Sequence, residues 1–179
     1  MNKNYLSNIF LTADFGHNIG YISSYLSCIE GTLLRLTRAG EYAVRSVLYL
    51  ASQGQGVVCN RKKIANAMDI PTQFLAKIAQ QLAHAGLIEI VQGSKGGLRL
   101  LKTPEKVSLL DVVEAVIGEI FLNDCLLKPE SCNRHNACAA HMVWQKARKQ
   151  LRETLRDATF AKLLQENSCY NPLEIQEDG

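Results

Sequence analysis

The stretch that decides the fold runs from residue 60 to residue 98 and reads NRKKIANAMDIPTQFLAKIAQQLAHAGLIEIVQGSKGGL. Asn60 is a favourable N-cap, and the apolar positions that follow it predict a short helix over 61–68. A turn at 69–71 leads into a second helix, predicted over about 71–85 because Pro suits a first helical turn and Gly suits a helix end. Two helices joined by so short a turn are typical of a helix-turn-helix.

The second helix of this pair has an apolar face and a polar face. Its apolar stripe is predicted to consist of Phe74, Leu75, Ile78, Leu82 and Ala85. The opposite face carries Gln73, Ala76, Lys77, Gln80 and His84. Gln can pair with adenine and Lys with guanine in the major groove, which makes Gln73 and Lys77 candidate base readers. The simpler alternative is that these polar side chains only solvate a surface helix.

The flanking segments complete a winged fold. Apolar residues at helical spacing predict a first helix over 38–51, and two strand-like runs at 87–91 and 98–101 enclose a glycine-rich tip at 93–97. The tip matches neither the P-loop nor the dinucleotide-binding spacing, so nucleotide binding is not expected. The order helix, helix, turn, helix, hairpin predicts a mainly α protein with a small β-hairpin wing: a winged helix-turn-helix.

Charge is distributed unevenly along the 179 residues, whose net charge is +3. Residues 35–102 contain ten Lys or Arg and three acidic residues, whereas residues 103–179 contain nine basic and twelve acidic residues. A basic segment beside an acidic remainder suits binding to phosphate, although a solvated basic face would look the same. No apolar run is long enough to span a membrane, so we expect a cytoplasmic protein with no membrane partner.

Three of the six cysteines, Cys125, Cys132 and Cys138, fall within fourteen residues, and His141 follows. A secreted disulfide scaffold would be denser in Cys, so thiolates that bind a metal in a reducing compartment are the better interpretation. Polar residues and a Pro between the cysteines predict a loop. Such ligands suit an iron-sulfur cluster or zinc, and three unliganded thiols are a further alternative. The remaining cysteines, interpreted as ordinary small side chains, are Cys28, Cys59 and Cys169.

The C-terminal part predicts two more helices. Ser108 and Asp111 resemble a capping box that opens a helix reaching Ile117, and a long helix should start near Ala139. The apolar stripe of the long helix is Ala140, Trp144, Ala147, Leu151, Leu155 and Ala158. Such a stripe suits packing against a second copy of the chain or, alternatively, an intramolecular core. No CxxC pair or general acid and base constellation is present, so an enzyme is not expected.

Several motifs in the right order closely resemble the Rrf-two family of transcriptional regulators, of the IscR and NsrR type. They are LTRAGEYAVR at 36–45, IPTQFL at 70–75, LAHAGLI at 82–88 and the wing GSKGG at 93–97. The resemblance covers about residues 34–165. It implies a homodimer that binds a partly palindromic double-stranded DNA operator through the recognition helix and the wing.

Carried onto this chain, the resemblance places base reading at Gln73, Ala76 and Lys77. Arg35, Thr37 and Arg61 are implied phosphate contacts. IscR-like members have an Arg at the wing position where this chain has Gln92, and Lys95 is the nearby substitute. The full candidate DNA-binding set is Arg35, Thr37, Arg61, Thr72, Gln73, Ala76, Lys77, Gln92, Ser94 and Lys95.

The resemblance also implies an iron-sulfur cluster held by Cys125, Cys132 and Cys138, with 2Fe-2S favoured, 4Fe-4S possible and zinc as a minor alternative. His141 matches the fourth ligand of IscR-like 2Fe-2S proteins, and Glu41 of the partner subunit is the competing fourth ligand. The predicted function is a sequence-specific DNA-binding regulator whose operator affinity the cluster controls. The alternative is a regulator of the same type without a cluster, controlled by thiol oxidation, a zinc site or a partner protein.

Four segments are expected along the chain. Residues 1–33 are predicted to be an extension outside the fold, 34–107 the winged helix-turn-helix, 108–165 the cysteine loop and dimerisation helix, and 166–179 a polar tail. Codons for Glu30-Gly31 can resemble a ribosome-binding site, so we hypothesise that translation begins at Leu33 or Leu34.

Overall fold

The computed structural model describes residues 36–134 and 137–166. The chain divides into residues 1–35 and residues 36–179, and every described residue belongs to the second unit. The predicted N-terminal extension, its proposed start sites, Arg35, Cys28, Cys169 and residues 167–179 of the predicted tail lie outside the described residues. The described elements are α2 (Arg38–Gln53), α3 (Arg61–Ala67), α4 (Thr72–His84), β1 (Ile88–Val91), β2 (Gly97–Leu100), the 3-10 helix η1 (Pro104–Lys106), α5 (Leu109–Ile117), α6 (Asp124–Leu127), the 3-10 helix η2 (Pro129–Ser131), α7 (Ala139–Asp157) and α8 (Phe160–Gln165).

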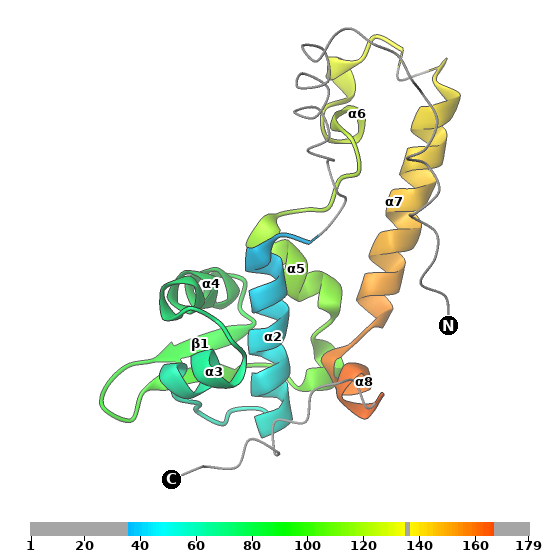
Figure 1. Cartoon of the computed structure of the whole chain (residues 1–179). Helices are drawn as coiled ribbons and strands as arrows, with labels where there is room; N and C mark the ends of the chain where they lie inside the picture. Colours follow the sequence, from blue (N-terminus) through cyan, green and yellow to red (C-terminus); the bar gives the residue numbers. More distant parts are fainter. Residues whose placement is uncertain (1–35, 135–136, 167–179) are drawn as a thin grey trace, which may run out of the picture. The chain divides into compact units, whose positions relative to one another are not determined.

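Helix α2 is the element around which the others are arranged (Figure 1). The Thr37 hydroxyl caps it by accepting a hydrogen bond from the Gly40 amide at 3.2 Å, which satisfies one of the amides left open at a helix start. Its buried residues include Ala43, Val47 and Leu50, which recur at helical spacing. Helices α3, α4, α5 and α8 and strand β2 all contact α2.

The helix-turn-helix forms as the sequence predicted. The Asn60 side chain accepts a hydrogen bond from the Lys62 amide at 2.8 Å and caps α3. The turn contains Asp69, whose φ of 50° is a left-handed conformation that Asp tolerates better than most residues. The amide of Ile70 then donates to the Ala65 carbonyl at 2.9 Å, and α4 begins after Pro71.

The predicted apolar stripe of α4 was wrong at two positions. Leu75, Ile78 and Leu82 are buried, together with Ala79, but Phe74 and Ala85 are exposed. Successive residues of a helix turn by about 100°, so Phe74 projects from the side of a stripe centred on Leu75 and Leu82. Tyr42 of α2 packs against the Phe74 ring but leaves half of this side chain exposed.

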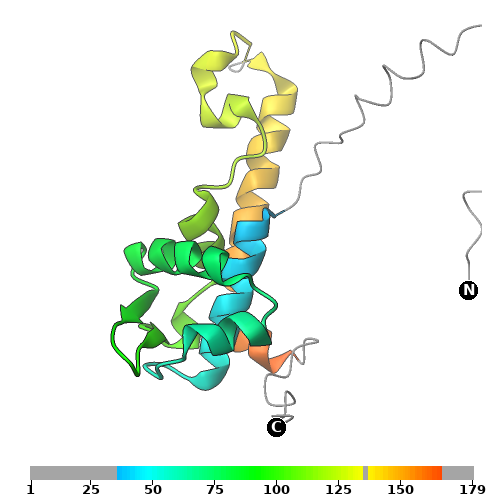
Figure 2. The same ribbon diagram turned by 60° about the vertical axis from the view of Figure 1, so that its left-hand side comes forward.

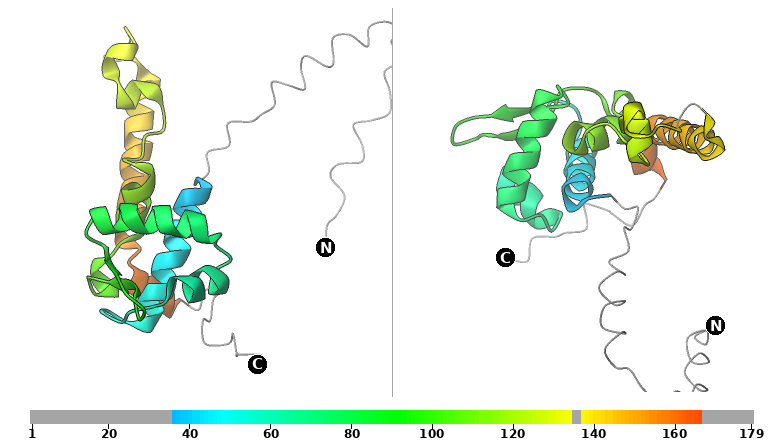
Figure 3. Two further views of the ribbon diagram at one scale, coloured as in Figure 1. Left: turned by 90° about the vertical axis from the view of Figure 1, so that its left-hand side faces the viewer. Right: turned by 90° about the horizontal axis from the view of Figure 1, so that it is seen from above.

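The wing is a two-stranded antiparallel hairpin in which Ile88 pairs with Leu100 and Val91 with Gly97. Cys59 extends this sheet through reciprocal backbone hydrogen bonds with Leu98 of 2.8 and 2.9 Å. A Cβ atom on Gly97 would lie 2.1 Å from the Cys59 carbonyl oxygen, so only glycine allows this approach. Seen from above, the hairpin projects beside α4 (Figure 3, right).

The chain returns to the core at α8. The predicted capping box at Ser108 and Asp111 is present, with backbone-to-side-chain hydrogen bonds of 2.9 and 3.2 Å. Beside it, the Phe160 amide donates to the Val107 carbonyl at 2.9 Å, and the Phe160 side chain is fully buried against α2 and its neighbours. The core that supports the helix-turn-helix therefore includes residues that precede the long helix α7 in the sequence and residues that follow it.

Helix α7 begins at Ala139, as predicted, and packs against α5 and α6. Its predicted apolar stripe is only partly covered within one chain, because Trp144 is exposed and Leu151 and Leu155 are half-buried. No helix within the described residues combines the length and the apolar character needed to cross a membrane.

The predicted loop between the cysteines contains short helical elements instead. Cys125 lies in α6, and η2 precedes Cys132. The Leu residues of α6 favour a helical turn, and Pro129 suits the first position of η2 because its fixed φ is already helical. The prediction of a continuous loop was therefore wrong for residues 124–131.

Replacing Phe160 by Ala should lower the free energy of unfolding by about 3–5 kcal/mol, because it leaves a cavity in the core. Urea unfolding followed by circular dichroism measures this change. The matched control is Val57→Ala at an exposed position, which should stay within about 0.5 kcal/mol of the parent. A Phe160 variant as stable as this control would contradict the role assigned to α8.

Candidate nucleic-acid interface and cysteine segment

The face of α4 opposite the core is polar and open. Thr72, Gln73, Ala76 and Lys77 are all exposed, as are Gln80 and His84 further along the helix. Figure 2 shows α4 crossing in front of α2, which supports it from behind. The apolar face of α4 is buried in the core, so the helix has a fixed orientation and its polar side chains point in a fixed direction. This is the geometry that a recognition helix requires.

The wing tip adds a second exposed surface. Gln92, Ser94 and Lys95 are exposed there. Gly93 has a φ of 102°, which L-residues with side chains rarely adopt, and its carbonyl accepts a hydrogen bond from the Gly96 amide at 3.0 Å. The glycines are thus needed to make the turn itself, and the turn leaves the Lys95 ammonium in solvent.

Three cations in a row open α3. Arg61, a predicted phosphate contact, is exposed, and so are Lys62 and Lys63, which the sequence reasoning did not select. The first turn of a helix carries partial positive charge and therefore disfavours cations. Three consecutive cations at an unfavourable place, with no acidic residue in the first turn, are a pattern that suits contact with an anion. This pattern could have identified Lys62 and Lys63 as further candidate phosphate contacts. Thr37 is also exposed, at the N-terminus of α2.

The three clustered cysteines are half-buried. Cys125 lies in α6, Cys132 follows η2 and Cys138 is the N-cap residue of α7. Within residues 36–134 and 137–166, no three His, Cys, Asp or Glu side chains are grouped so that they could hold a metal ion. The chemistry of the donors fits an iron-sulfur cluster or zinc, but one chain in this conformation does not bring them to a common centre.

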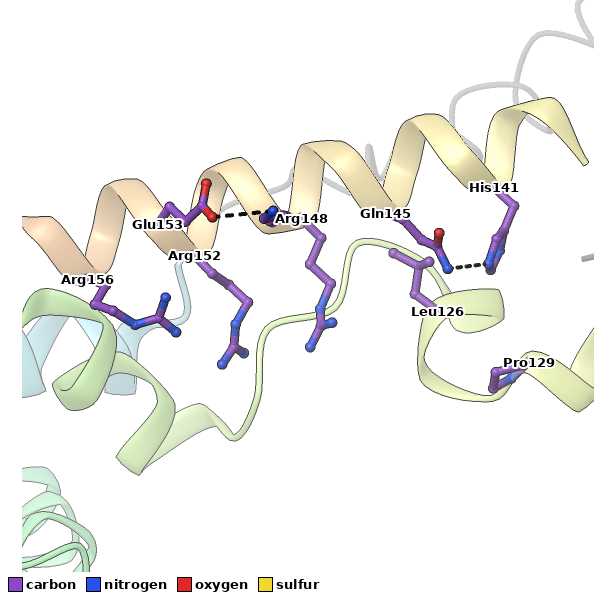
Figure 4. Close-up of a pocket in the computed structure, with 9 residues that line it drawn as sticks. Leu126, Pro129, His141, Gln145, Arg148, Arg152, Glu153 and Arg156 are labelled. Carbon is purple, nitrogen blue, oxygen red and sulfur yellow. Dashed lines mark hydrogen bonds and ion pairs between the residues drawn. The ribbon is translucent and has the colours of Figure 1, made fainter.

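His141 lies in the first turn of α7 and is buried. Its Nε2 atom is 2.9 Å from Nε2 of Gln145, one turn later. Both residues line a cavity of about 450 Å³ between α7 and the segment that contains Leu126 and Pro129 (Figure 4). The predicted fourth ligand thus faces the cysteine segment, although its Nε2 already contacts an amide.

Glu41 and Cys59 have local roles in this chain. The Glu41 carboxylate lies 3.4 Å from Arg38 in the first turn of α2. Cys59 is buried in the core, and burial raises the pKa of its thiol, an effect that the nearby Lys63 only partly opposes. A neutral buried thiol is a poor nucleophile and a poor ligand, which agrees with the interpretation of Cys59 as a packing residue.

Two arginines attach α7 to the end of α5. Arg148 donates from Nε to the Ile120 carbonyl at 2.7 Å, pairs with Glu119 and stacks 4.2 Å from the centre of the Phe121 ring. Arg152 pairs with Glu114, a residue of α5. Figure 4 shows both side chains directed from α7 toward this segment.

A further hydrogen bond connects α5 to the recognition helix. Nε2 of Gln81 in α4 donates to the Val116 carbonyl in α5 at 3.2 Å. Contacts therefore continue from the middle of α7 to α5 and on to α4. Sequence reasoning missed them because the partners are far apart in the sequence, and no local pattern pairs them.

This arrangement defines a winged helix-turn-helix DNA-binding protein. Residues 36–166 match the family model Rrf2, described as an iron-dependent transcriptional regulator, and the chain belongs to the Rrf2 family. The regulator NsrR of Shouchella clausii is 30% identical over 132 residues, which cover 73% of this chain and 89% of NsrR.

Solved structures of related proteins have the same fold. IscR of T. potens has a TM-score of 0.59 and 22% identity, covering 80% of this chain and 93% of that chain. The oxidised form of CymR from Staphylococcus aureus has a TM-score of 0.58 and 25% identity, covering 73% of this chain and 95% of that chain. The predicted fold class and the prediction of a transcriptional regulator rather than an enzyme are confirmed.

Proposed function

We propose that this regulator binds its operator as a homodimer and that an iron-sulfur cluster at the cysteine segment controls its affinity for DNA. The observation that carries the DNA-binding part is the open face of α4, where Gln73, Ala76 and Lys77 are exposed while the opposite face is fixed in the core. Gln and Lys side chains supply the hydrogen bonds that distinguish base pairs in the major groove.

Phosphate contacts position the protein on the duplex. Thr37, Arg61 and Lys95 are exposed at the start of α2, the start of α3 and the wing tip. In the proposed complex Gln73 and Lys77 read base edges while these three residues contact the backbone, with Thr72, Gln92 and Ser94 at the edges of the interface. Arg35 belongs to the same proposed set.

We expect the two kinds of contact to separate in a salt titration. Arg61→Ala should reduce the slope of log K against log salt concentration by about 1, because one phosphate contact is lost. Gln73→Ala should leave the slope unchanged and cost about 1–3 kcal/mol on the preferred sequence but not on non-specific DNA. Fluorescence anisotropy measures both, on an operator selected from a random duplex library.

Lys106→Ala is the matched control, since Lys106 is exposed on η1 and outside the proposed interface. Its affinity and salt slope should equal those of the parent. An Arg61 variant that behaves like this control would remove Arg61 from the interface.

The proposal of a homodimer is supported by the apolar surface at the start of α7. The exposed fraction is 65% for Met142, 64% for Val143 and 42% for Trp144. Leu127 is also exposed, and it belongs to α6, which contacts α7. Consecutive large apolar residues on a helix are costly to leave in water, and proteins rarely do so without a partner. Pairing of α7 with a second copy would cover them.

Cys125, Cys132 and Cys138 would hold the cluster, with His141 or Glu41 of the partner subunit as the fourth ligand. Their half-buried thiols lie within a short segment beside the start of α7. Once bound, the cluster would supply a group that responds to iron and oxidants. Because His141 Nε2 contacts Gln145, ligation through that atom requires Gln145 to rotate away. A nitrogen or carboxylate ligand would hold the cluster less firmly than a fourth thiolate.

Protein purified without oxygen should contain iron and sulfide and show a visible absorption band, and Cys132→Ala should abolish the band. Iron, sulfide and zinc quantitation with an optical spectrum makes the measurement. Cys59→Ala is the control, because Cys59 is buried in the core away from the cysteine segment, and it should keep the band. Zinc without sulfide, or an unchanged band in the Cys132 variant, would contradict the cluster.

A second candidate mechanism for regulating operator affinity is thiol oxidation without a cluster. Two observations favour it: within the described residues the cysteines are not grouped around a common centre, and the chain is similar to a CymR whose oxidised form has been solved. In this case anaerobic protein would contain neither iron nor sulfide. Its operator affinity would change when two thiols lose two electrons and two protons to an added oxidant and form a disulfide.

Either signal would reach the DNA-binding face through α7 and α5. Cys138 is the N-cap residue of α7, Arg152 fixes α7 to Glu114 of α5, and α5 contacts α4 through the Gln81 hydrogen bond. A change at the cysteine segment can alter operator affinity only if it shifts α7 between two positions that differ in their affinity for DNA.

Glu114→Gln should therefore weaken the coupling while leaving operator binding itself intact. We expect the ratio of operator affinities before and after treatment, by cluster removal or by oxidation, to fall toward one. Glu153→Gln is the control, since Glu153 is exposed and pairs only loosely with Lys149 at 3.9 Å on the same helix. A full response in the Glu114 variant would place the connection elsewhere.

A further inference from the structure

The recognition helix exposes one aromatic side chain that the proposed contacts do not use. We propose that Phe74 is a specificity-determining residue that contacts the methyl group of a thymine in the operator. The inference rests on the proposed operator binding and extends it from hydrogen-bonding side chains to an apolar reader of one base.

Phe74 is 50% exposed, whereas Leu75, Ile78 and Leu82 of the same helix are each 1% exposed. It lies in the first turn of α4, next to Gln73 and three residues before Lys77. Residues at the N-terminal end of a recognition helix are the ones that reach base edges. A large apolar ring at this position has an energetic cost in water that burial against DNA would remove.

The ring of Phe74 is held in place from behind. Tyr42 of α2 meets it edge to face, with 5.9 Å between ring centroids and 62° between ring planes. Arg45 lies 5.8 Å from the centroid of the Tyr42 ring and donates to the Met68 carbonyl at 3.4 Å. Phe74 is thus connected through Tyr42 and Arg45 to the turn that precedes α4, and less side-chain entropy is lost when it contacts a ligand.

The chemistry of the neighbouring side chains suggests the occupant. Among the bases, thymine alone presents a methyl group in the major groove, and Phe is one of the side chains that contact it. The exposed Gln73 amide and the Lys77 ammonium beside it supply hydrogen bonds to adjacent base edges. An apolar ring beside two such groups fits a groove that offers a methyl group among polar atoms, and it fits a purely phosphate surface poorly.

The test replaces the thymidines of a selected operator, one at a time, with deoxyuridine, which lacks only the methyl group. With the full-length protein, one position in each half-site should weaken binding about fourfold, which corresponds to about 0.8 kcal/mol for one buried carbon. With Phe74→Ala the same replacement should have no effect. With Phe74→Leu, which keeps an apolar side chain, part of the effect should remain. Fluorescence anisotropy gives the dissociation constants.

Gln73→Ala is the matched control, because it removes a polar neighbour and should keep the full deoxyuridine effect. Circular dichroism and size-exclusion chromatography check the fold and the oligomeric state of each variant. An equal deoxyuridine effect in the parent and in Phe74→Ala would overturn the inference, and so would a Phe74 variant that changes oligomeric state. If the parent selects no operator at all, the proposed function itself fails, which is a distinguishable result.

Discussion

The burial of one face of α4 against α2 and α5 is the constraint on which the DNA-binding surface depends. Leu75, Ile78 and Leu82 can leave the core only at the cost of exposing large apolar side chains, so the helix cannot rotate about its axis. The opposite face is therefore fixed in direction, and the exposed residues of α4 form a constant pattern. A mobile helix with the same sequence would have no defined surface to match a base sequence.

The same core receives α8, so the C-terminal end of the long helix α7 is anchored to it. At its C-terminal end the chain returns to Phe160, which is buried with residues of α2. Arg148 in the middle of α7 and Arg152 one turn later connect the helix to α5 and to the residues that follow α5. The middle and the C-terminal end of α7 are therefore held against the DNA-binding part, and the proposed coupling depends on these contacts.

Sequence patterns predicted the local elements well because their causes are local. Asn60 caps α3 and Ser108 with Asp111 forms a capping box, and each interaction joins residues within three positions of one another. The glycines of the wing were identified as a turn for the same reason. The order of elements then indicated the winged fold, and the resemblance of four sequence motifs indicated the family. Phe74 was predicted to be part of the buried stripe but is half exposed. Periodicity shows which side chains are apolar, but it cannot show how much of the helix surface the neighbouring helices cover.

Some features of the candidate site likewise follow from the sequence, and others follow only from the tertiary structure. The residue types of the α4 face and of the cysteine segment, and their spacing, are properties of the sequence alone, as is the class of protein they indicate. The tertiary structure decided that Cys59 is buried beside Leu98, that Phe74 rests on Tyr42, and that Arg152 meets Glu114. These contacts join residues distant in sequence, and their geometry depends on how whole helices pack. No periodicity or capping pattern contains that information.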